Sequence, residues 1–326
     1  MIRLAIDMMG GDLGSKATLE GVRIFQNKHP GKVEFLLVGK KEELAELKDC
    51  RIVDAREVVP ADAGVLDALR LKESSMFKAV ELVKLGEADG VISCGGTGAF
   101  LSDATVTLRN IPGVKRAALV APFPTAMKDK KVVILDVGAS NENSGEEIAQ
   151  FATMGSLYSR YIYGIEEPRV FVLANGTEED KGSPEGKIAY KILSEEKQIN
   201  FGGNIEAREV LSGQADVVVT DGYSGNIFLK GSEGVAKLMG EMIKRSFKRN
   251  LFSKIGYLFS KKGFKEMSQT MGYESVGGAL LLGVNGVVVK AHGSSDGEAV
   301  SSAIEVAYTL VKNNIVEKIK EGLANE

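Results

Sequence analysis

Short apolar runs, each ending in a glycine-containing loop with a polar side chain, recur along the chain. Amphipathic stretches with apolar residues at i, i+3 and i+4 separate many of these runs. Val/Ile/Leu-rich strands between amphipathic helices are typical of a mainly parallel sheet covered on both faces. The pattern therefore predicts a three-layer α/β/α sandwich, formed as one unit by residues 1–326 because no Pro/Ser/Gly-rich linker divides them. The runs with their loops are residues 4–12, 90–98, 132–140, 170–178, 217–226 and 287–295.

The loops after these runs predict where a ligand binds. In open α/β sheets, ligands bind in the crevice beyond the carboxyl ends of the strands. Glycine allows backbone N–H groups to approach a ligand closely, and a helix N-terminus after such a loop favours an anion. We therefore expect the loops to meet at one edge of the sheet and to form a single anion site.

A basic segment near residue 250 differs from the rest of the chain. Residues 244–265 carry eight Lys or Arg and no Asp or Glu. We expect a basic amphipathic helical hairpin inserted at about 244–272, broken at Gly256 and Gly263. Such a stretch is typical of docking to a membrane surface or a partner, and a surface helix packed on its own core is the alternative. The candidate docking residues are Phe247, Lys248, Leu251, Ile255, Leu258 and Phe259.

Composition and motifs narrow the class of protein. The formal net charge is −3, which gives no reason to expect nucleic-acid binding. Two cysteines are too few for a disulfide framework and fit a reducing cytoplasm. The apolar N-terminal run is too short for a signal peptide, and no run of 18 apolar residues occurs. The GxGxxG, GxxxxGK[ST], HExxH and CxxC motifs are absent, so we expect neither a metal nor a cofactor.

Few side chains in the loops carry reactive chemistry. His292 ends a strand-like run, where it is a candidate proton carrier or anion ligand; a hydrogen-bonded structural histidine is the alternative. Cys94 also follows a run, and we expect a small buried thiol rather than a nucleophile. Carboxylates at the run ends could bind a metal, position a base or accept hydrogen bonds from glycine loops, although Asp is also a common turn residue. These carboxylates are Asp7, Asp12, Asp136 and Asp221.

The motifs along nearly the whole chain resemble the bacterial acyl-[acyl carrier protein]:phosphate acyltransferases of phospholipid synthesis. AIDMMGGD, ISCGGTGAF, LDVGAS and TEEDKG occur in the order of that family, and DGYSGNIFLK, GGALLLG and KAHGSS are the most distinctive. The resemblance implies a fold similar to isopropylmalate dehydrogenase and phosphate acetyltransferase, usually as a homodimer. It implies the transfer of an acyl group from acyl carrier protein to inorganic phosphate, with no covalent enzyme intermediate. Alanine in the relatives at position 94 argues against a cysteine nucleophile.

The resemblance also assigns expected roles and partners. His292, Lys181, Asp221 and Asp7 are the catalytic candidates. The acyl phosphate product would pass to a membrane glycerol-3-phosphate acyltransferase, so we expect a cytoplasmic protein in contact with the inner face of the membrane. The basic hairpin would bind the acidic carrier protein or the membrane. The candidates for binding phosphate or substrate are Gly10, Gly11, Asp12, Ser93, Thr97, Gly98, Arg116, Asp136, Asn226, Lys230 and Ser294.

Other functions stay open on the sequence alone. A phosphate acetyltransferase that uses a coenzyme A ester would share the scaffold and the anion loops. A decarboxylating dehydrogenase would need a nicotinamide cofactor and a divalent metal. A non-catalytic acyl- or lipid-binding scaffold would use the same hairpin without consuming phosphate.

Overall fold

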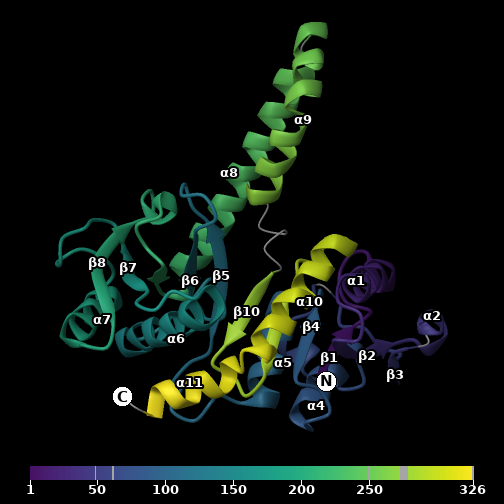
Figure 1. Ribbon diagram of the computed structural model, residues 1–326. Helices are drawn as coiled ribbons and strands as arrows, with labels where there is room; N and C mark the ends of the chain where they lie inside the picture. Colours follow the sequence, from purple (N-terminus) through teal and green to yellow (C-terminus); the bar gives the residue numbers. More distant parts are fainter. Residues whose placement is uncertain (48, 61, 249, 272–277, 325–326) are drawn as a thin grey trace.

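A computed structural model describes the chain except for residues 48, 61, 249, 272–277 and 325–326 and the side chains of residues 251, 254 and 265–271. Within the described residues, eleven strands form one sheet in the order β3-β2-β1-β4-β11-β10-β5-β6-β9-β7-β8 (Figure 1). All six predicted apolar runs form strands, namely β1, β4, β6, β7, β9 and β11. The strands are β1 (Ile2–Asp7), β2 (Val33–Gly39), β3 (Arg51–Asp54), β4 (Gly90–Ser93), β5 (Ala118–Pro124), β6 (Lys131–Leu135), β7 (Arg169–Ala174), β8 (Asn200–Glu206), β9 (Val217–Val219), β10 (Ala279–Leu282) and β11 (Val287–Lys290).

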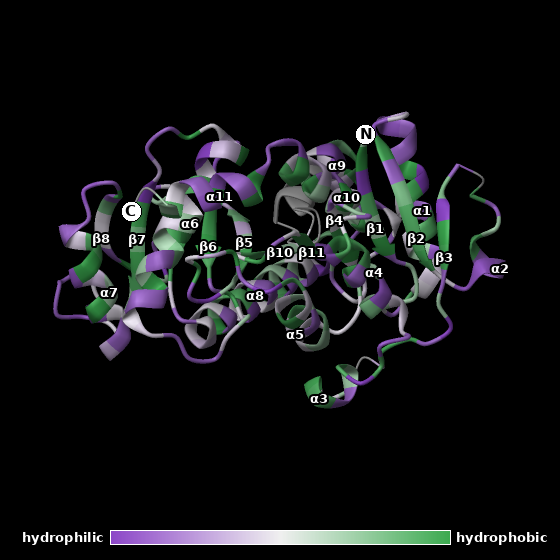
Figure 2. Cartoon of the chain, turned by 90° about the horizontal axis from the view of Figure 1, so that it is seen from below, coloured by the Kyte–Doolittle hydropathy of each residue, from purple (hydrophilic) through white to green (hydrophobic). Residues whose placement is uncertain are grey.

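Helices cover both faces of the sheet, which confirms the predicted three-layer sandwich (Figure 2). Helices α1, α6, α7, α10 and α11 pack on one face, and α3, α4, α5 and the start of α8 pack on the other. The helices are α1 (Gly14–Lys28), α2 (Lys41–Leu44), α3 (Val65–Ala68), α4 (Ser75–Lys84), α5 (Thr97–Leu108), α6 (Gly145–Tyr163), α7 (Pro184–Glu195), α8 (Gly222–Lys248), α9 (Leu251–Met271), α10 (Gly297–Lys312) and α11 (Ile315–Ala324).

The strands run in opposite directions in the two halves of the sheet. Strands β3, β2, β1, β4 and β11 are parallel, as are β6, β9, β7 and β8. Between these sets, each of the steps β11–β10, β10–β5 and β5–β6 is antiparallel. Three reversals leave β6 antiparallel to β11, so the carboxyl ends of the two sets point to opposite edges. The expected single edge for all six loops is therefore wrong.

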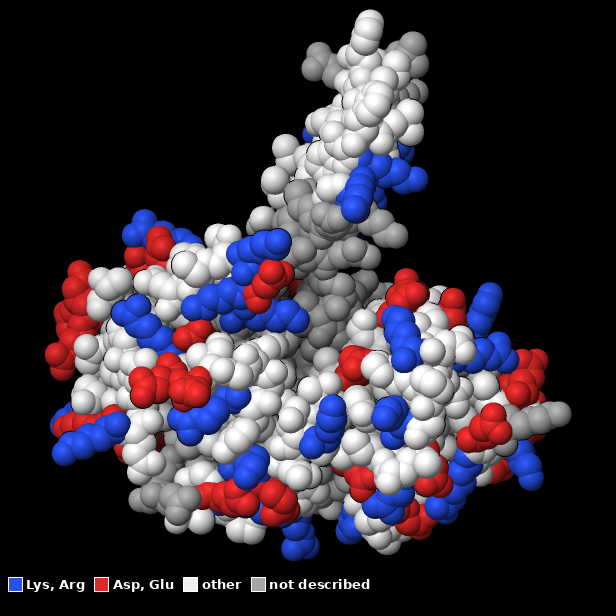
Figure 3. Space-filling model, in the orientation of Figure 1, with Lys and Arg blue, Asp and Glu red and all other residues white. Residues whose placement is uncertain are grey.

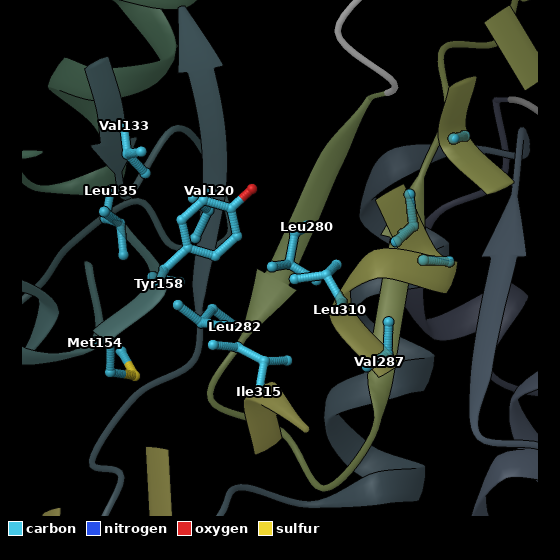
Figure 4. Packing of buried hydrophobic residues seen from close by; sticks show 14 of the residues in the cluster. Val120, Val133, Leu135, Met154, Tyr158, Leu280, Leu282, Val287, Leu310 and Ile315 are labelled. Atoms are coloured by element: carbon cyan, nitrogen blue, oxygen red, sulfur yellow. The ribbon is translucent and has the colours of Figure 1, made fainter. Parts of the chain in front are cut away.

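The centre of the sheet, where the direction reverses, is also the centre of the core. Val120 of β5, Leu135 of β6 and Leu280 of β10 are at most 3% exposed. They belong to one cluster with Tyr158 of α6 and Leu310 of α10 (Figure 4). Burying such a large aliphatic or aromatic side chain typically stabilises a fold by about 1.5–3 kcal/mol. This packing joins the two halves and fixes the positions of the loops at both edges.

The basic segment belongs to a long antiparallel pair of helices that extends away from the sheet (Figure 1). Helix α8 continues without a break from the sheet to Lys248, and α9 starts at Leu251. The expected breaks at Gly256 and Gly263 are wrong, because both glycines lie inside α9. A glycine in an exposed helix costs only about 1 kcal/mol relative to alanine. Packing of the Phe247 ring 5.3 Å from Tyr257 and 4.8 Å from Phe264 offsets that cost.

Candidate active site

The Asp7 carboxylate connects the ends of two strands to the start of a helix. It is 1% exposed, and its Oδ1 accepts hydrogen bonds from Ser75 Oγ at 2.6 Å and from the backbone N–H groups of Met9 and Gly10 at 3.2 Å each. Its Oδ2 accepts a hydrogen bond from Ser93 Oγ at 2.6 Å. Hydrogen bonds to a charged acceptor are about twice as strong as neutral ones. This network therefore holds the loop after β1 rigidly against β4 and α4.

Three loops meet above this network and form the first loop cluster, defined as residues 8–12, 94–98 and 291–295. The Asp12 N–H donates to the Gly293 carbonyl oxygen at 2.7 Å. A Cβ on Gly11, whose φ is +88°, would lie 2.8 Å from the Cys94 Cβ. A Cβ on Gly10 would lie 2.7 Å from the Gly95 nitrogen. These glycines allow the loops to pack closely. The packing brings together the predicted site residues of the loops after β1, β4 and β11.

The start of α5 supplies backbone donors to the first loop cluster. Thr97 and Gly98 are exposed and form its first turn, which contains no acidic residue. The first N–H groups of a helix have no partner within the helix, and the helix dipole favours a negative charge there. The α5 start, placed beside the glycine loops, is therefore suited to an anion such as phosphate.

His292 is exposed within the same cluster. Its Nδ1 accepts a hydrogen bond from the Ser294 N–H at 3.2 Å and lies 2.8 Å from Ser294 Oγ. Because Nδ1 is the acceptor, the neutral ring carries its proton on Nε2. That arrangement orients the Nε2–H of His292 as a donor in the exposed part of the cluster. Ser294, the other predicted residue of this loop, is exposed there as well.

Lys290, the last residue of β11, is a candidate that the sequence reading missed. It is 6% exposed, and the alternation along β11 places it on the face shared with Asp7 and Ser93. Its Nζ donates to the Ala291 carbonyl oxygen. Burial lowers the pKa of Lys290 to about 8. A lysine that ends an apolar VVVK run was the available signal, because lysine is rarely buried without a specific role.

Cys94 lies beside Lys290 and is 4% exposed. Burial raises the pKa of its thiol to about 11, although Lys290 acts in the opposite direction. The thiolate is the nucleophilic form of cysteine, so this environment disfavours nucleophilic chemistry. The result agrees with the prediction of a small buried thiol.

The second loop cluster is defined as residues 136–143, 175–182 and 220–226, which follow the neighbouring parallel strands β6, β7 and β9 at the opposite edge. Asp136 organises the first of these loops. Its carboxylate is fully buried and accepts hydrogen bonds from four backbone N–H groups at 2.8–2.9 Å. Burial raises the pKa of Asp136, and these N–H groups oppose that increase. Arg116 joins the cluster through its Nε, which donates to Ser140 Oγ at 2.9 Å. The donors to Asp136 are Leu119, Gly138, Ala139 and Ser140.

Two predicted catalytic residues belong to this second cluster. Asp221 Oδ1 accepts a hydrogen bond from the Ser224 N–H at 2.8 Å, which stabilises the start of α8. Lys181 is half-buried in the loop after β7, with its Cγ 2.7 Å from the position of a Cβ on Gly176. The structure therefore places Asp221 and Lys181 at the edge opposite to that of His292.

Helix α8 connects the two clusters. Its Asn226 side chain lies against Gly138, whose Cβ position is 3.3 Å from Asn226 Cγ. Lys230, one helical turn later, is exposed and lies within electrostatic range of Lys290. Lys230 Nζ also pairs with Glu233 at 2.8 Å. The exposed side of α8 therefore leads from the Asp136 loop towards the buried lysine of the first cluster.

The predicted docking residues lie on α8 and α9. Figure 3 shows Lys and Arg side chains on one side of this pair of helices, where it leaves the body of the molecule. Leu258 is 70% and Phe259 88% exposed, whereas Phe247 packs inside the pair. Phe252, which was not among the predicted residues, is 86% exposed. Ile255 and Lys248 are exposed as well, and the Leu251 side chain lies outside the described part. Among the described residues, no helix has the length and apolar character needed to cross a bilayer.

Comparisons with known proteins agree on the family. A family model described as "Fatty acid synthesis protein" matches residues 2–318. A phosphate acyltransferase from Exiguobacterium sp. is 42% identical over 329 residues, which cover 99% of each chain. A branched-chain phosphotransacylase from Enterococcus faecalis has a TM-score of 0.63 at 13% identity, over 95% of this chain and 99% of that one. A 4-hydroxythreonine-4-phosphate dehydrogenase from Klebsiella pneumoniae has a TM-score of 0.54 at 13% identity, over the same shares.

The two solved structures show the fold alone, and they confirm the expected likeness to phosphate-dependent acyltransferases and dehydrogenases. The sequence comparisons go further, because they cover nearly the whole chain at an identity that leaves the family in no doubt. They confirm an enzyme that transfers acyl groups in lipid synthesis. The chain belongs to the fatty acid synthesis protein family that includes the phosphate acyltransferases.

Proposed function

We propose that the chain transfers an acyl group from acyl carrier protein to inorganic phosphate, the first step towards phosphatidic acid. A phosphate oxygen attacks the thioester carbonyl carbon, the C–S bond breaks, and acyl phosphate and the free carrier thiol result. The observation that carries this proposal is the meeting of three glycine loops, one of which leads into the open start of α5 and another of which carries the exposed His292. This arrangement provides backbone donors for a phosphate or for the oxyanion of the tetrahedral intermediate.

The first loop cluster suggests where phosphate binds. Phosphate would bind at the start of α5 near Gly10 and Gly11, with Lys230 as the nearby exposed cation. His292 Nε2 would donate a hydrogen bond to phosphate or to the oxyanion. Losing one such donor typically costs about 2.7–4 kcal/mol of transition-state stabilisation. Lys181 and Asn226 belong to the second loop cluster at the opposite edge, so this step is assigned to the first cluster and to Lys230 of α8.

The direct test is to incubate the protein with palmitoyl-[acyl carrier protein] and inorganic phosphate and to trap acyl phosphate with hydroxylamine. We expect hydroxamate in amounts that depend on phosphate. The coenzyme A alternative is tested by palmitoyl- and acetyl-coenzyme A in parallel, and carrier protein is expected to be the better donor. A protein that binds palmitate without consuming phosphate would contradict the proposal and favour a lipid-binding scaffold.

We also propose that the outer part of the α8–α9 pair binds the surface of the membrane. Phe252, Leu258 and Phe259 expose apolar side chains on a segment rich in Lys and Arg. Near an anionic leaflet each basic residue contributes about 1 kcal/mol. Contact with the cytoplasmic face would bring the labile acyl phosphate close to a membrane glycerol-3-phosphate acyltransferase, and the same basic surface would attract the acidic carrier protein.

Replacing Phe252 and Phe259 with Glu is expected to lower binding to phosphatidylglycerol vesicles at least tenfold, because two apolar contacts are lost and two negative charges are added. Co-sedimentation measures the binding. Leu66→Glu with Val106→Glu is the matched control, since these residues are 74% and 65% exposed but lie on α3 and α5. Equal losses in both double variants, or no loss in the first, would contradict the proposed anchor.

A second copy of the chain is the partner that we propose for the apolar stripe on α8. Val235, Leu238, Met239 and Met242 follow helical spacing and are 44–61% exposed. Burying such a stripe against its symmetry mate is the usual basis of an isologous dimer. Light scattering is expected to give twice the chain mass of 34.9 kDa, and a particle of the single-chain mass would contradict the homodimer.

A further inference from the structure

We propose that Lys290 transfers the proton in this reaction, taking it from the attacking phosphate and giving it to the leaving thiolate. This inference rests on the proposed function and deepens it. The starting observation is a lysine buried to 6% exposure at the end of β11, directly beneath the first loop cluster. Burying an ammonium group is costly, so a role that requires it is expected.

Residues from β1, β4 and α8 and from the loops after β1 and β4 surround Lys290. Lys290 is paired in register with Ser93 of β4, and Ser93 in turn donates to Asp7 of β1. Asp7, Cys94 and Asp12 each favour the charged lysine, whereas Lys230 of α8 disfavours it. Asp12 and Lys230 are exposed, and Asp7 and Cys94 are buried. Lys290 therefore lies at the boundary between the buried network and the open side of the cluster.

A group that transfers a proton must be able to take both its protonated and its deprotonated form near neutral pH. Burial is the main influence on Lys290 and lowers its pKa to about 8. An ordinary thiol such as that of cysteine has a pKa of about 8.5, so proton transfer from such a lysine to a thiolate is nearly balanced in energy. An exposed lysine, with a pKa of about 10.4, would hold its proton too tightly at neutral pH.

The step balances without another reactant. Hydrogen phosphate forms the new C–O bond and loses its proton to the neutral amine of Lys290. The tetrahedral intermediate then breaks its C–S bond, and the ammonium group returns the proton to sulfur. The products are acyl phosphate and the carrier thiol, and Lys290 is again neutral. His292 keeps a separate task, since its Nε2–H is oriented as a donor to the phosphate or the oxyanion.

The decisive experiment varies the leaving group. We expect Lys290→Met to lower kcat at least about 100-fold with palmitoyl-[acyl carrier protein], the range for loss of a general acid–base group. With the palmitoyl thioester of a nitrothiophenol, whose thiolate leaves without a proton, the same variant should lose less of its kcat, because Lys290 is then needed only to take the proton from phosphate. Equal losses with both thioesters would overturn the transfer of the proton to sulfur, and no loss with either would overturn the proposal as a whole.

Lys290→Arg separates proton transfer from simple charge. The guanidinium stays charged at all accessible pH values, so binding of phosphate should persist while the loss of kcat matches that of Lys290→Met. In the wild type, kcat/KM should rise with pH and level off above about 8, because the neutral amine is the competent base, and Lys290→Arg should lack that limb. Full activity of Lys290→Arg would overturn the proposal.

Two controls keep the outcomes distinct. The Tm of Lys290→Met should be no lower than that of the wild type at pH 7, because the variant removes a buried charge. If the wild type itself formed no phosphate-dependent hydroxamate from either thioester, the proposed function would fail, whereas a wild-type reaction that is indifferent to Lys290 would refute only the proton-transfer role.

Discussion

Replacing Asp136 with Ala is expected to lower the free energy of unfolding by about 3–5 kcal/mol, because it removes the acceptor of several buried donors at once. The carboxylate is fully buried and accepts hydrogen bonds from the N–H groups of Leu119, Gly138, Ala139 and Ser140. One of these donors belongs to β5 and the others to the loop after β6. The variant would leave all four without this acceptor, and the N–H groups of Leu119 and Ser140 would be left in the buried interior.

Urea unfolding, followed by far-ultraviolet circular dichroism, measures this effect. Asp136→Asn is the conservative variant, since its amide keeps one acceptor oxygen, and it should be less destabilised than Asp136→Ala. Asp221→Ala is the matched control, because Asp221 accepts one N–H at the start of α8, and losing such a cap typically costs about 1 kcal/mol. A loss in Asp136→Ala no larger than in Asp221→Ala would contradict the organising role of the buried carboxylate.

The strands could be predicted from the sequence because their signal is local. Each Val/Ile/Leu run is long enough to cross the sheet, and burial on both faces requires apolar residues at successive positions. Their directions could not be predicted in the same way. The antiparallel placement of β10 between β11 and β5 joins segments more than 150 residues apart, as in the pairing of Leu280 with Val120. No local pattern contains that information, and it decides which loops share an edge.

The candidate site was predictable only in part for a similar reason. Asp7, Ser93 and the glycine pair were found because they follow apolar runs, where ligands bind. The partner of Asp7 on α4, Ser75, lies 68 residues away and follows no apolar run, so it was not among the predicted site residues. Lys290 was overlooked because a lysine at the end of a strand is usually exposed, and its burial depends on the elements packed around that strand.

Replacing Asp7 is expected to reduce activity strongly and to shift its pH dependence in a defined direction. Asp7→Ala should lower kcat/KM about 100-fold, because the carboxylate holds the loop after β1, and a displacement of about 1 Å in an active site costs that much. Asp7→Asn keeps the shape but removes the negative charge near Lys290. Since that charge raises the pKa of Lys290, its removal should lower the pKa and move the rising limb of kcat/KM to lower pH.

Lys230→Gln is expected to shift the pH profile in the opposite direction to Asp7→Asn. The Lys230 charge lowers the pKa of Lys290, so removing it should raise that pKa and move the limb to higher pH. Asp12→Asn should act in the same direction as Asp7→Asn, and less strongly, because its influence on Lys290 is smaller. Profiles measured between pH 6 and 10 separate these outcomes even where the rates themselves fall. A limb that stayed in place in all three variants would assign the titrating group to another residue, because no other explanation leaves a buried lysine indifferent to the charges that surround it.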